Sequence, residues 1–414
     1  MTYHAYEIRR RVVSPVYRTA ALVGDVVSTM PRGADANVVI RSLDAWSQTI
    51  SALQVTHTRP AFGIDSVDVD GEAVPVSEDT VFSTPFASLL RFTKQVSAEQ
   101  PRVLILPGLA GHFATLVRDT VATMLPDHDV YVADWHNARD VPADAGRFGL
   151  DEFIEHIMVF LGEIGPGTHL VAVCQPCPAA IAAAALMTED GHSAKPRSLV
   201  LMSGPVDARV NPGPINRYAT SYRPGILERS VIATVPKPYA GQGRRVYPGF
   251  LQLVGFLGLA PARHASAFAS FFADIAAGRE PSERTRPFYE EFFAVLDITA
   301  EFYLDTAHTI FRDHDLARGE LHWRGRRVDP SLIRGALLTV EAENDELCPP
   351  GQTHAAHALC TGIPDRRKRH HLQASVGHYG VFSGSKFRRE IYPRIREFIA
   401  EMSSADYDEA GSEG

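Results

Sequence analysis

The sequence predicts an α/β fold in which a mostly parallel central sheet is covered by helices. From about residue 100, short apolar runs alternate with helix-forming stretches, which is the pattern of a parallel sheet with helices on both faces. The expected strands are 103–106, 130–133, 170–174, 199–202 and 336–341. Between Pro205 and about Arg327 this alternation stops, and Pro, Gly and aromatic residues become frequent. We therefore expect an inserted cap domain that interrupts the sheet-forming part of the chain.

These patterns divide the chain into five parts. Residues 63–71 alternate between polar and apolar and end in Asp-Gly, which predicts a strand entering a hairpin at the start of the core. The predicted parts are an N-terminal helical segment (1–62), the first part of the core (63–204), the cap insertion (205–327), the second part of the core (328–402) and an acidic, disordered tail (403–414).

Composition excludes several classes of function. The chain has 414 residues and a net charge of −8, which argues against a general nucleic-acid-binding protein. No stretch reaches the roughly 20 apolar residues of a membrane span, and the N-terminus lacks the apolar core of a signal peptide. We therefore expect a cytoplasmic protein, in a compartment where a free thiol stays reduced.

We expect no cofactor and no metal. The four cysteines lack the paired spacing of a zinc site. His354 and His357 have helical i, i+3 spacing, but no carboxylate or cysteine completes a convincing set around them. His370 and His371 are neighbours in a predicted strand, so their rings should point to opposite faces.

Cys174 is the first candidate catalytic residue. It ends an apolar strand, and an Ala-rich, helix-forming run follows from Pro178 to Met187. Strand, tight corner and helix is the layout of a nucleophile elbow, whose usual pattern is Gly-x-Ser-x-Gly. Here residues 172–176 read Ala-Val-Cys-Gln-Pro, and proline suits the first turn of a helix. Two alternatives stay open: a buried structural cysteine, and a redox pair with Cys177.

An acid and a histidine follow in the chain order of α/β-hydrolase triads. Asp345 comes just after the predicted strand 336–341, and His378 lies between two glycines near the C-terminus. In this interpretation the sulfur attacks an acyl carbon, the imidazole accepts the thiol proton and the carboxylate orients the imidazole. Glu343 and Glu346 are alternative acids. Asp345 as a helix cap and His378 as a solvent-exposed loop residue are the alternatives without a catalytic role.

The oxyanion formed on attack needs two backbone donors. The N–H of Gln175 is one by its position directly after the nucleophile. The loop 106–112 follows the strand 103–106, and we expect the N–H of Leu109 to be the other donor, with that of Ala110 as the alternative. His112 is expected to border the site, and residues 134–137 to form a hydrogen-bonded loop that braces it.

Five segments carry a resemblance to a known family: 107–116, 134–142, 173–176, 297–306 and 377–384. With them the chain resembles the intracellular poly(3-hydroxybutyrate) depolymerases, bacterial enzymes of the storage-polymer cycle. The resemblance covers nearly the whole chain up to about Met402. It implies a Cys-Asp-His triad, which the motifs match to Cys174, Asp345 and His378.

The resemblance implies a hydrolase that cleaves poly(3-hydroxybutyrate) and its oligomers through a cysteine acyl-enzyme. The expected partner is the amorphous polymer granule, and the oligomeric state is open. Most aromatic side chains of the cap should form its core, and a minority should line a groove for the polyester. Two alternatives remain. One is an acyltransferase like the polyhydroxyalkanoate synthases, whose pattern has glycines around the cysteine that this chain lacks. The other is a non-catalytic granule protein.

Overall fold

The structure is a computed structural model, and it describes residues 3–30, 37–96, 99–222, 225–259, 261–279 and 285–404. The predicted acidic tail lies outside these residues, apart from its first two positions. Within the described ranges, no helix combines the length and the apolar character that crossing a bilayer requires.

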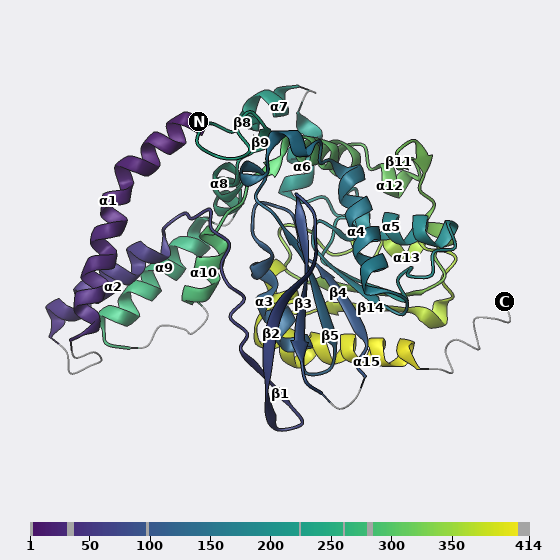
Figure 1. Cartoon of the computed structure of the whole chain (residues 1–414), viewed down its shortest axis with the longest axis horizontal. Helices are drawn as coiled ribbons and strands as arrows, with labels where there is room; N and C mark the ends of the chain where they lie inside the picture. The colour runs from purple at the N-terminus through teal and green to yellow at the C-terminus, as the bar shows by residue number, and fades with distance from the viewer. Residues whose placement is uncertain are drawn as a thin grey trace.

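A nine-stranded sheet forms the centre of the molecule, in the order β1-β2-β3-β5-β4-β6-β7-β13-β14 (Figure 1). Its strands are β1 (Ser66–Val69), β2 (Glu72–Ser83), β3 (Ala87–Lys94), β4 (Arg102–Leu106), β5 (Asp129–Trp135), β6 (His169–Val173), β7 (Ser198–Met202), β13 (Ala336–Ala342) and β14 (Lys368–Gln373). The strands from β1 to β3, and β3 with β5, pair antiparallel, and all pairs from β5 to β14 are parallel. The first strands of the sheet are antiparallel, β5 precedes β4 in the sheet order, and the other strands are parallel. This topology is that of the α/β-hydrolase fold, which confirms the predicted fold class.

The sheet is buried on both faces, and most positions of its central strands are apolar. In β4, Leu104 and Leu106 face one hydrophobic cluster, whereas Val103 and Ile105 face the other. This alternation follows from the two-residue period of a strand. Helices α4 (Leu150–Ile164) and α5 (Cys177–Glu189) cover the first face, and α3 (Arg118–Met124) and α15 (Tyr392–Ser403) cover the second.

The segment between β7 and β13 forms the cap. Its helices are α6 (Pro214–Ser221), α7 (Ile226–Val231), α8 (Gly249–Leu259), α9 (Pro261–Ala276), α10 (Thr285–Phe293), α11 (Ala300–Thr306) and α12 (Asp315–Arg318). Its short strands are β8 (Ala233–Thr234), β9 (Arg245–Tyr247), β10 (Ile298–Thr299), β11 (His322–Trp323) and β12 (Arg326–Arg327). Two short helices, α13 (Ala356–Leu359) and α14 (Gly384–Lys386), belong to the core that follows.

The cap is tied to the loops that leave the carboxyl ends of β4 and β5. The N–H of Leu296 donates to the carbonyl of Gly111 at 2.9 Å, and the N–H of Ala138 donates to the carbonyl of Asp297 at 2.9 Å. The cap therefore covers the edge of the sheet at which α/β-hydrolases place their site residues.

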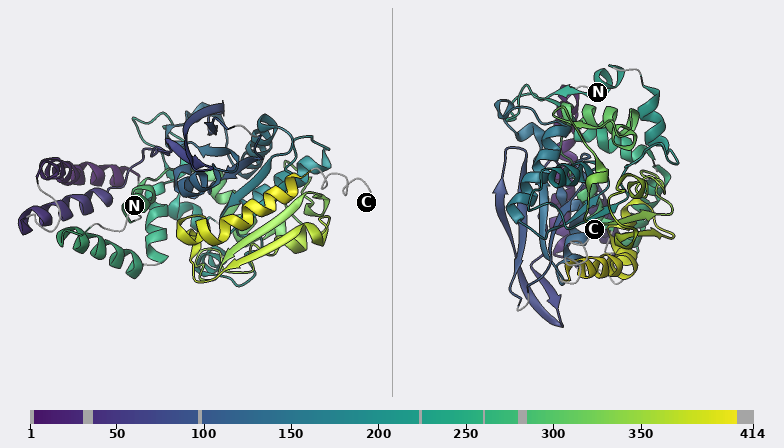
Figure 2. Two further views of the ribbon diagram at one scale, coloured as in Figure 1. Left: turned by 90° about the horizontal axis from the view of Figure 1, so that it is seen from below. Right: turned by 90° about the vertical axis from the view of Figure 1, so that its right-hand side faces the viewer.

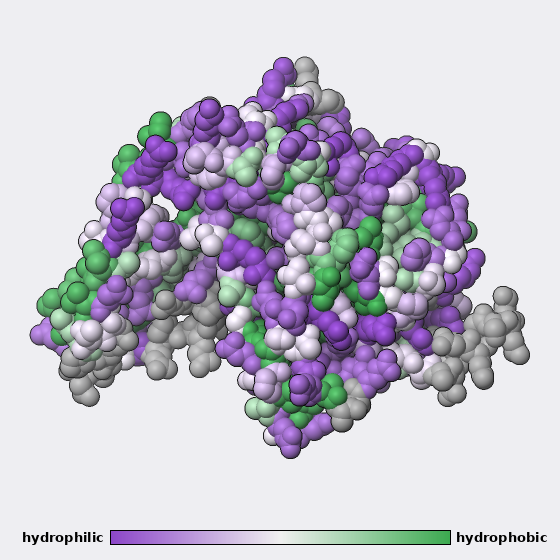
Figure 3. Space-filling model, viewed as in Figure 1, coloured by the Kyte–Doolittle hydropathy of each residue, from purple (hydrophilic) through white to green (hydrophobic). Residues whose placement is uncertain are grey.

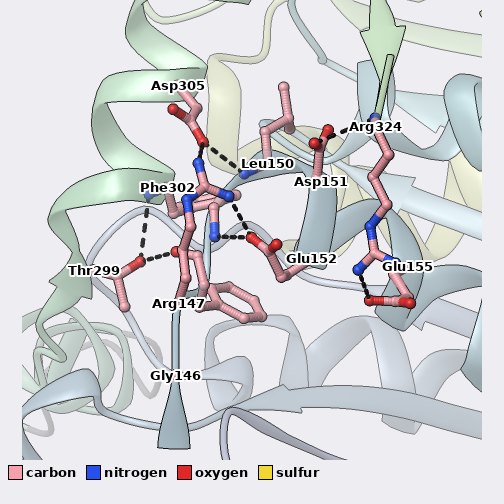
Figure 4. A network of polar contacts seen from close by, with 12 residues as sticks. Gly146, Arg147, Leu150, Asp151, Glu152, Glu155, Thr299, Phe302, Asp305 and Arg324 are labelled. Carbon is pink, nitrogen blue, oxygen red and sulfur yellow. Dashed lines mark hydrogen bonds and ion pairs between the residues drawn. The ribbon is translucent and has the colours of Figure 1, made fainter. Parts of the chain in front are cut away.

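A second attachment joins the cap to the start of α4. Arg147 lies just before α4 and contacts both Glu152 in that helix and Asp305 in α11, each at 2.6 Å (Figure 4). Asp305 also accepts the N–H of Leu150 at 3.2 Å. A carboxylate at a helix N-terminus satisfies an N–H group that has no partner within the helix. Asp305 therefore caps the N-terminus of α4 and, through the same bonds, holds α11 against it.

The predicted N-terminal helical segment forms α1 (Tyr3–Ser28) and α2 (Val38–Ala52). These helices pack against each other, and α2 also packs against α9 of the cap, so the three form a lobe beside the sheet (Figures 1 and 2). The hydroxyl of Tyr3 donates to the buried carboxylate of Asp297 at 2.6 Å, and the ring of Tyr6 stacks on Phe250 at 3.8 Å. The start of the chain is thus attached to the cap.

Candidate active site

Cys174 sits at a sharp corner between β6 and α5. Its φ is +68°, a left-handed conformation that costs a residue with a side chain roughly 1–2 kcal/mol. Two hydrogen bonds fix the corner: the N–H of Cys174 donates to the carbonyl of Met202 at 2.8 Å, and the N–H of Cys177 donates to the carbonyl of Cys174 at 3.2 Å. The strained residue is therefore the predicted nucleophile, and the backbone around it has the geometry of a nucleophile elbow.

Small residues around the corner allow helix and strand to approach. Pro176 has φ −73° and ψ −6° and precedes the first residue of α5, as its fixed φ favours. The glycine that the close approach requires comes from another strand. A Cβ at Gly204, just beyond β7, would overlap the side chain of Cys177 and the carbonyl of Cys174. The sequence pattern around Cys174 lacks glycine because Gly204 leaves the space instead.

Cys177 does not form a redox pair with Cys174 in this structure. Its side chain is fully buried, and its sulfur faces the carbonyl oxygens of Ala172 at 3.4 Å and Met202 at 3.9 Å. Burial raises the pKa of the Cys177 thiol. The geometry therefore favours packing over redox chemistry for Cys177.

Asp345 and His378 are brought together beside Cys174. Nδ1 of His378 lies 2.8 Å and 3.0 Å from the two carboxylate oxygens of Asp345, and both residues are buried. Burial by itself lowers the pKa of His378, but the Asp345 carboxylate and the Cys174 sulfur more than offset it and hold that pKa well above its usual value. Because Nδ1 is bonded to Asp345, Nε2 is the nitrogen available to accept a proton from a thiol.

The geometry distinguishes Asp345 from the alternative acids. Burial alone would raise the pKa of Asp345, but the His378 ring and the backbone N–H groups of Cys348 and Leu347 hold it below its usual value. Asp345 therefore caps this turn and contacts the histidine at once. Glu343 is exposed and accepts the N–H of Ser375 at 2.7 Å.

The predicted oxyanion donors lie side by side, but one is occupied by the chain itself. The N–H of Leu109 donates to the side-chain oxygen of Gln175 at 3.3 Å. The indole of Trp135 donates to the carbonyl of Pro107 at 3.1 Å, so residues from the predicted bracing loop hold this turn. The sequence predicted the backbone N–H of Gln175 as one donor. It did not predict that the side chain of Gln175 would accept the N–H of Leu109, the other donor.

A narrow pocket opens between the cap and the loops that carry Asp345 and His378. Its lining residues are Phe256, Leu259, His264, Phe292, Glu346, Leu347, His378 and Tyr379. Two cap aromatics, Phe256 and Phe292, thus line the approach to His378. His112 lies behind them, with its ring 5.3 Å and 5.2 Å from theirs, and burial lowers its pKa to about 4. The pocket lining therefore combines aromatic and aliphatic side chains with the polar groups of His264, Glu346 and His378.

Selective alkylation tests the exposure of Cys174. Of the four cysteines, Cys174 is half-buried, and Cys177, Cys348 and Cys360 are buried. We expect iodoacetamide to add one carbamidomethyl group to the native protein, at Cys174, because the other three cysteines are buried. After denaturation we expect four. Peptide mass spectrometry locates the group. Cys174→Ala should accept none in the native state, and rapid labelling of Cys177 would contradict this geometry.

Parts of this chain are similar to known proteins. Residues 203–403 match the family described as PHB de-polymerase C-terminus. A poly(3-hydroxyalkanoate) polymerase subunit PhaC from Haloferax mediterranei is 25% identical over 114 residues, which cover 28% of this chain and 22% of that protein. The same subunit from Haloarcula marismortui is 25% identical over 109 residues, covering 26% of this chain and 22% of that protein.

The matched region is therefore about a fifth of each curated relative. Among solved structures, a thermophilic esterase from Thermogutta terrifontis aligns with 80% of this chain and 99% of its own, at 14% identity and a TM-score of 0.43. The strand order and the elbow give this chain an α/β-hydrolase fold, and its second half is similar to the family described as PHB de-polymerase C-terminus.

Proposed function

We propose that this protein hydrolyses poly(3-hydroxybutyrate) and its oligomers to 3-hydroxybutyrate units. The observation that carries the proposal is the strained Cys174 corner beside the buried His378–Asp345 pair. The match of residues 203–403 to a PHB de-polymerase family supports a polyester as substrate. The aromatic side chains of Phe256 and Phe292 in the pocket lining suit an uncharged chain, which offers no charge for recognition.

The chemistry runs in two steps. Nε2 of His378 accepts the thiol proton while the sulfur of Cys174 attacks the ester carbon, and the ester C–O bond then breaks. The departing alkoxide takes the proton from His378, which leaves a thioester on the enzyme. Water attacks this thioester, gives a proton to His378 and releases the acid, and the sulfur recovers its proton. Asp345 stabilises the imidazolium in both steps.

In the resting site, Gln175 blocks part of the oxyanion hole. Its side-chain oxygen accepts the N–H of Leu109, which is the donor that a negatively charged oxygen would need. The substrate carbonyl therefore displaces the carboxamide before attack. Both partners of this contact are neutral, so displacing it costs much less than breaking a buried ion pair.

The alternative function is acyl transfer, as in the polymerase subunits that this chain partly resembles. Both functions share the attack by Cys174 and differ in what resolves the thioester: water in a hydrolase, and the hydroxyl of a growing chain in a polymerase. A single assay separates them. The purified protein is given either amorphous polymer or 3-hydroxybutyryl-CoA, and free acid, free CoA and polymer are measured.

We expect release of 3-hydroxybutyrate from amorphous polymer and no polymer from the CoA ester. Cys174→Ala should abolish the release because no other residue replaces the sulfur. Cys174→Ser should be strongly impaired because a hydroxyl needs a stronger base. Cys177→Ala is the matched control and should stay active. Polymer formed from the CoA ester would establish the acyltransferase instead, and an active Cys174→Ala with an inactive Cys177→Ala would overturn the mechanism.

The role of the acid is tested by Asp345→Asn. An amide cannot stabilise the imidazolium, so we expect turnover to fall by about 10²–10⁴-fold with the fold intact by circular dichroism. Glu343→Gln is the control and should leave turnover within about twofold, since its side chain is exposed and accepts the N–H of Ser375. The reverse result, an active Asp345→Asn and an inactive Glu343→Gln, would reassign the acid.

We further propose that α1 contacts the polymer granule. Five apolar side chains on one face of this helix are exposed, by 45 to 71%: Ile8, Val12, Val16, Leu22 and Val26. Their spacing returns to the same face of a 3.6-residue helix, opposite the face that packs on α2. Figure 3 shows apolar residues along this outer edge of the molecule. A solid polyester is an apolar surface that such a face can bind by excluding water.

A pair of adjacent substitutions on α1 tests the granule contact. Leu22→Asp places a charge on the apolar face, and Ala21→Asp places the same charge on an exposed position away from it. We expect Leu22→Asp to weaken sedimentation with amorphous granules by about tenfold, since burying a leucine side chain contributes about 1.5–3 kcal/mol. Ala21→Asp should bind like its parent. Measurements in the Cys174→Ala background prevent digestion, and equal losses for both variants would refute the contact.

A further inference from the structure

Three histidines, His354, His357 and His370, lie close together at the surface of the core. His354 lies in the turn before α13, His357 lies in α13, and His370 lies in β14. Each ring offers one nitrogen as a ligand atom, and these three nitrogens all lie within 4.8 Å of one another. The ring of His354 is 4.7 Å from that of His357 and 4.4 Å from that of His370. The spacing of His354 and His357 was visible in the sequence, whereas the third ring arrives only through the pairing of β14 with β13.

Buried side chains of β13 hold these rings in place. The hydroxyl of Thr339 lies 2.8 Å from Nε2 of His357 and 2.9 Å from Nδ1 of His370. The hydroxyl oxygen has two lone pairs, so it can accept an N–H from each ring, which leaves a lone pair on the other nitrogen of each ring. Glu341, also buried, accepts the backbone N–H of His354 at 3.0 Å and lies 3.9 Å from Nε2 of His370. Hydroxyl and carboxylate partners of this kind orient histidine ligands in metal sites.

The side chains that face one another in this cluster suit a cation as their ligand, because imidazole nitrogens are common metal ligands. His354 and His370 are exposed, so an ion can reach them from solvent.

We propose that His354, His357 and His370 form a binding site for a divalent transition-metal ion, with zinc as the reference ion. Imidazole donors suit zinc, nickel and copper, and three protein ligands leave a position for water. At zinc–nitrogen distances of about 2.1 Å, tetrahedral ligands lie about 3.4 Å apart, so the exposed rings need to rotate inward slightly.

The ion would tie β14 to the segment that follows Asp345. Glu341 accepts the N–H groups of Gly351, Thr353 and His354, so it already holds this segment against β13. A ligand bridge from His354 to His370 would add a second attachment. Because the ion would bridge two segments of the core, we expect its binding to raise thermal stability. This inference does not depend on the proposed function.

The test is titration of tag-free protein with ZnCl₂ by calorimetry, in the Cys174→Ala background so that the thiol cannot bind the ion. We expect one equivalent of zinc to bind and to raise the melting temperature. His354→Ala and His370→Ala should each weaken binding at least about tenfold and remove the thermal shift. His371→Ala is the matched control: it is the next residue of β14, and its ring bonds Gln373 at 2.9 Å.

Three results would overturn the site. They are no zinc binding by the parent protein, unchanged binding in His354→Ala and His370→Ala, and an equal loss in His371→Ala. Far-ultraviolet circular dichroism of each variant without zinc distinguishes a lost ligand from a lost fold. If a histidine variant is unfolded, His354→Gln replaces His354→Ala, because glutamine is close to histidine in size and is a poor zinc ligand.

Discussion

The left-handed turn at Cys174 is the constraint on which the candidate site depends. A residue with a side chain adopts this conformation only when its surroundings hold it there. Here the carbonyl of Met202 in β7 accepts the N–H of Cys174, and Gly204, just beyond β7, leaves space for the corner. Helix α5 packs against the sheet through a run of alanines. The corner sets the position of the sulfur, and the adjacent strand ends then place every other site group within reach of it.

Each of those groups comes from the carboxyl end of a parallel strand. The Leu109 loop follows β4, Asp345 follows β13, and His378 follows β14. Because these strands are parallel, their ends share one edge of the sheet, and the cap closes over that edge through its bonds to Gly111 and Ala138. Burial makes the interaction of His378 with Asp345 strong, since little water screens it. The same enclosure gives the pocket its apolar wall.

The sequence was sufficient to predict the order of these parts because each one has a local pattern. The apolar runs of β4, β6, β7 and β13 and the break at the cap were all visible, and the predicted fold class is confirmed. The chain order of Cys174, Asp345 and His378 indicated the site residues, and the structure brings the three together. Their catalytic roles stay predictions.

Other features depend on contacts between distant segments and had no local signal. Gly204 replaces the missing glycines of the elbow only because β7 lies beside β6. The side chain of Gln175 reaches Leu109 across the same edge, 66 positions away in the chain. His370 joins His354 through the register of β14 against β13. In the cap, aromatic content indicated a hydrophobic core, but not that Phe256 and Phe292 would line the pocket.

The most direct test of the central claim is the capture of the acyl-enzyme. The protein is mixed with a soluble 3-hydroxybutyrate oligomer, quenched in acid within the first turnover and digested for mass spectrometry. We expect the peptide that contains Cys174 to carry an added 3-hydroxybutyryl group or a short oligomer, which disappears as free acid accumulates. Turnover with no adduct on that peptide, or with a stable adduct on another residue, would contradict a Cys174 acyl-enzyme.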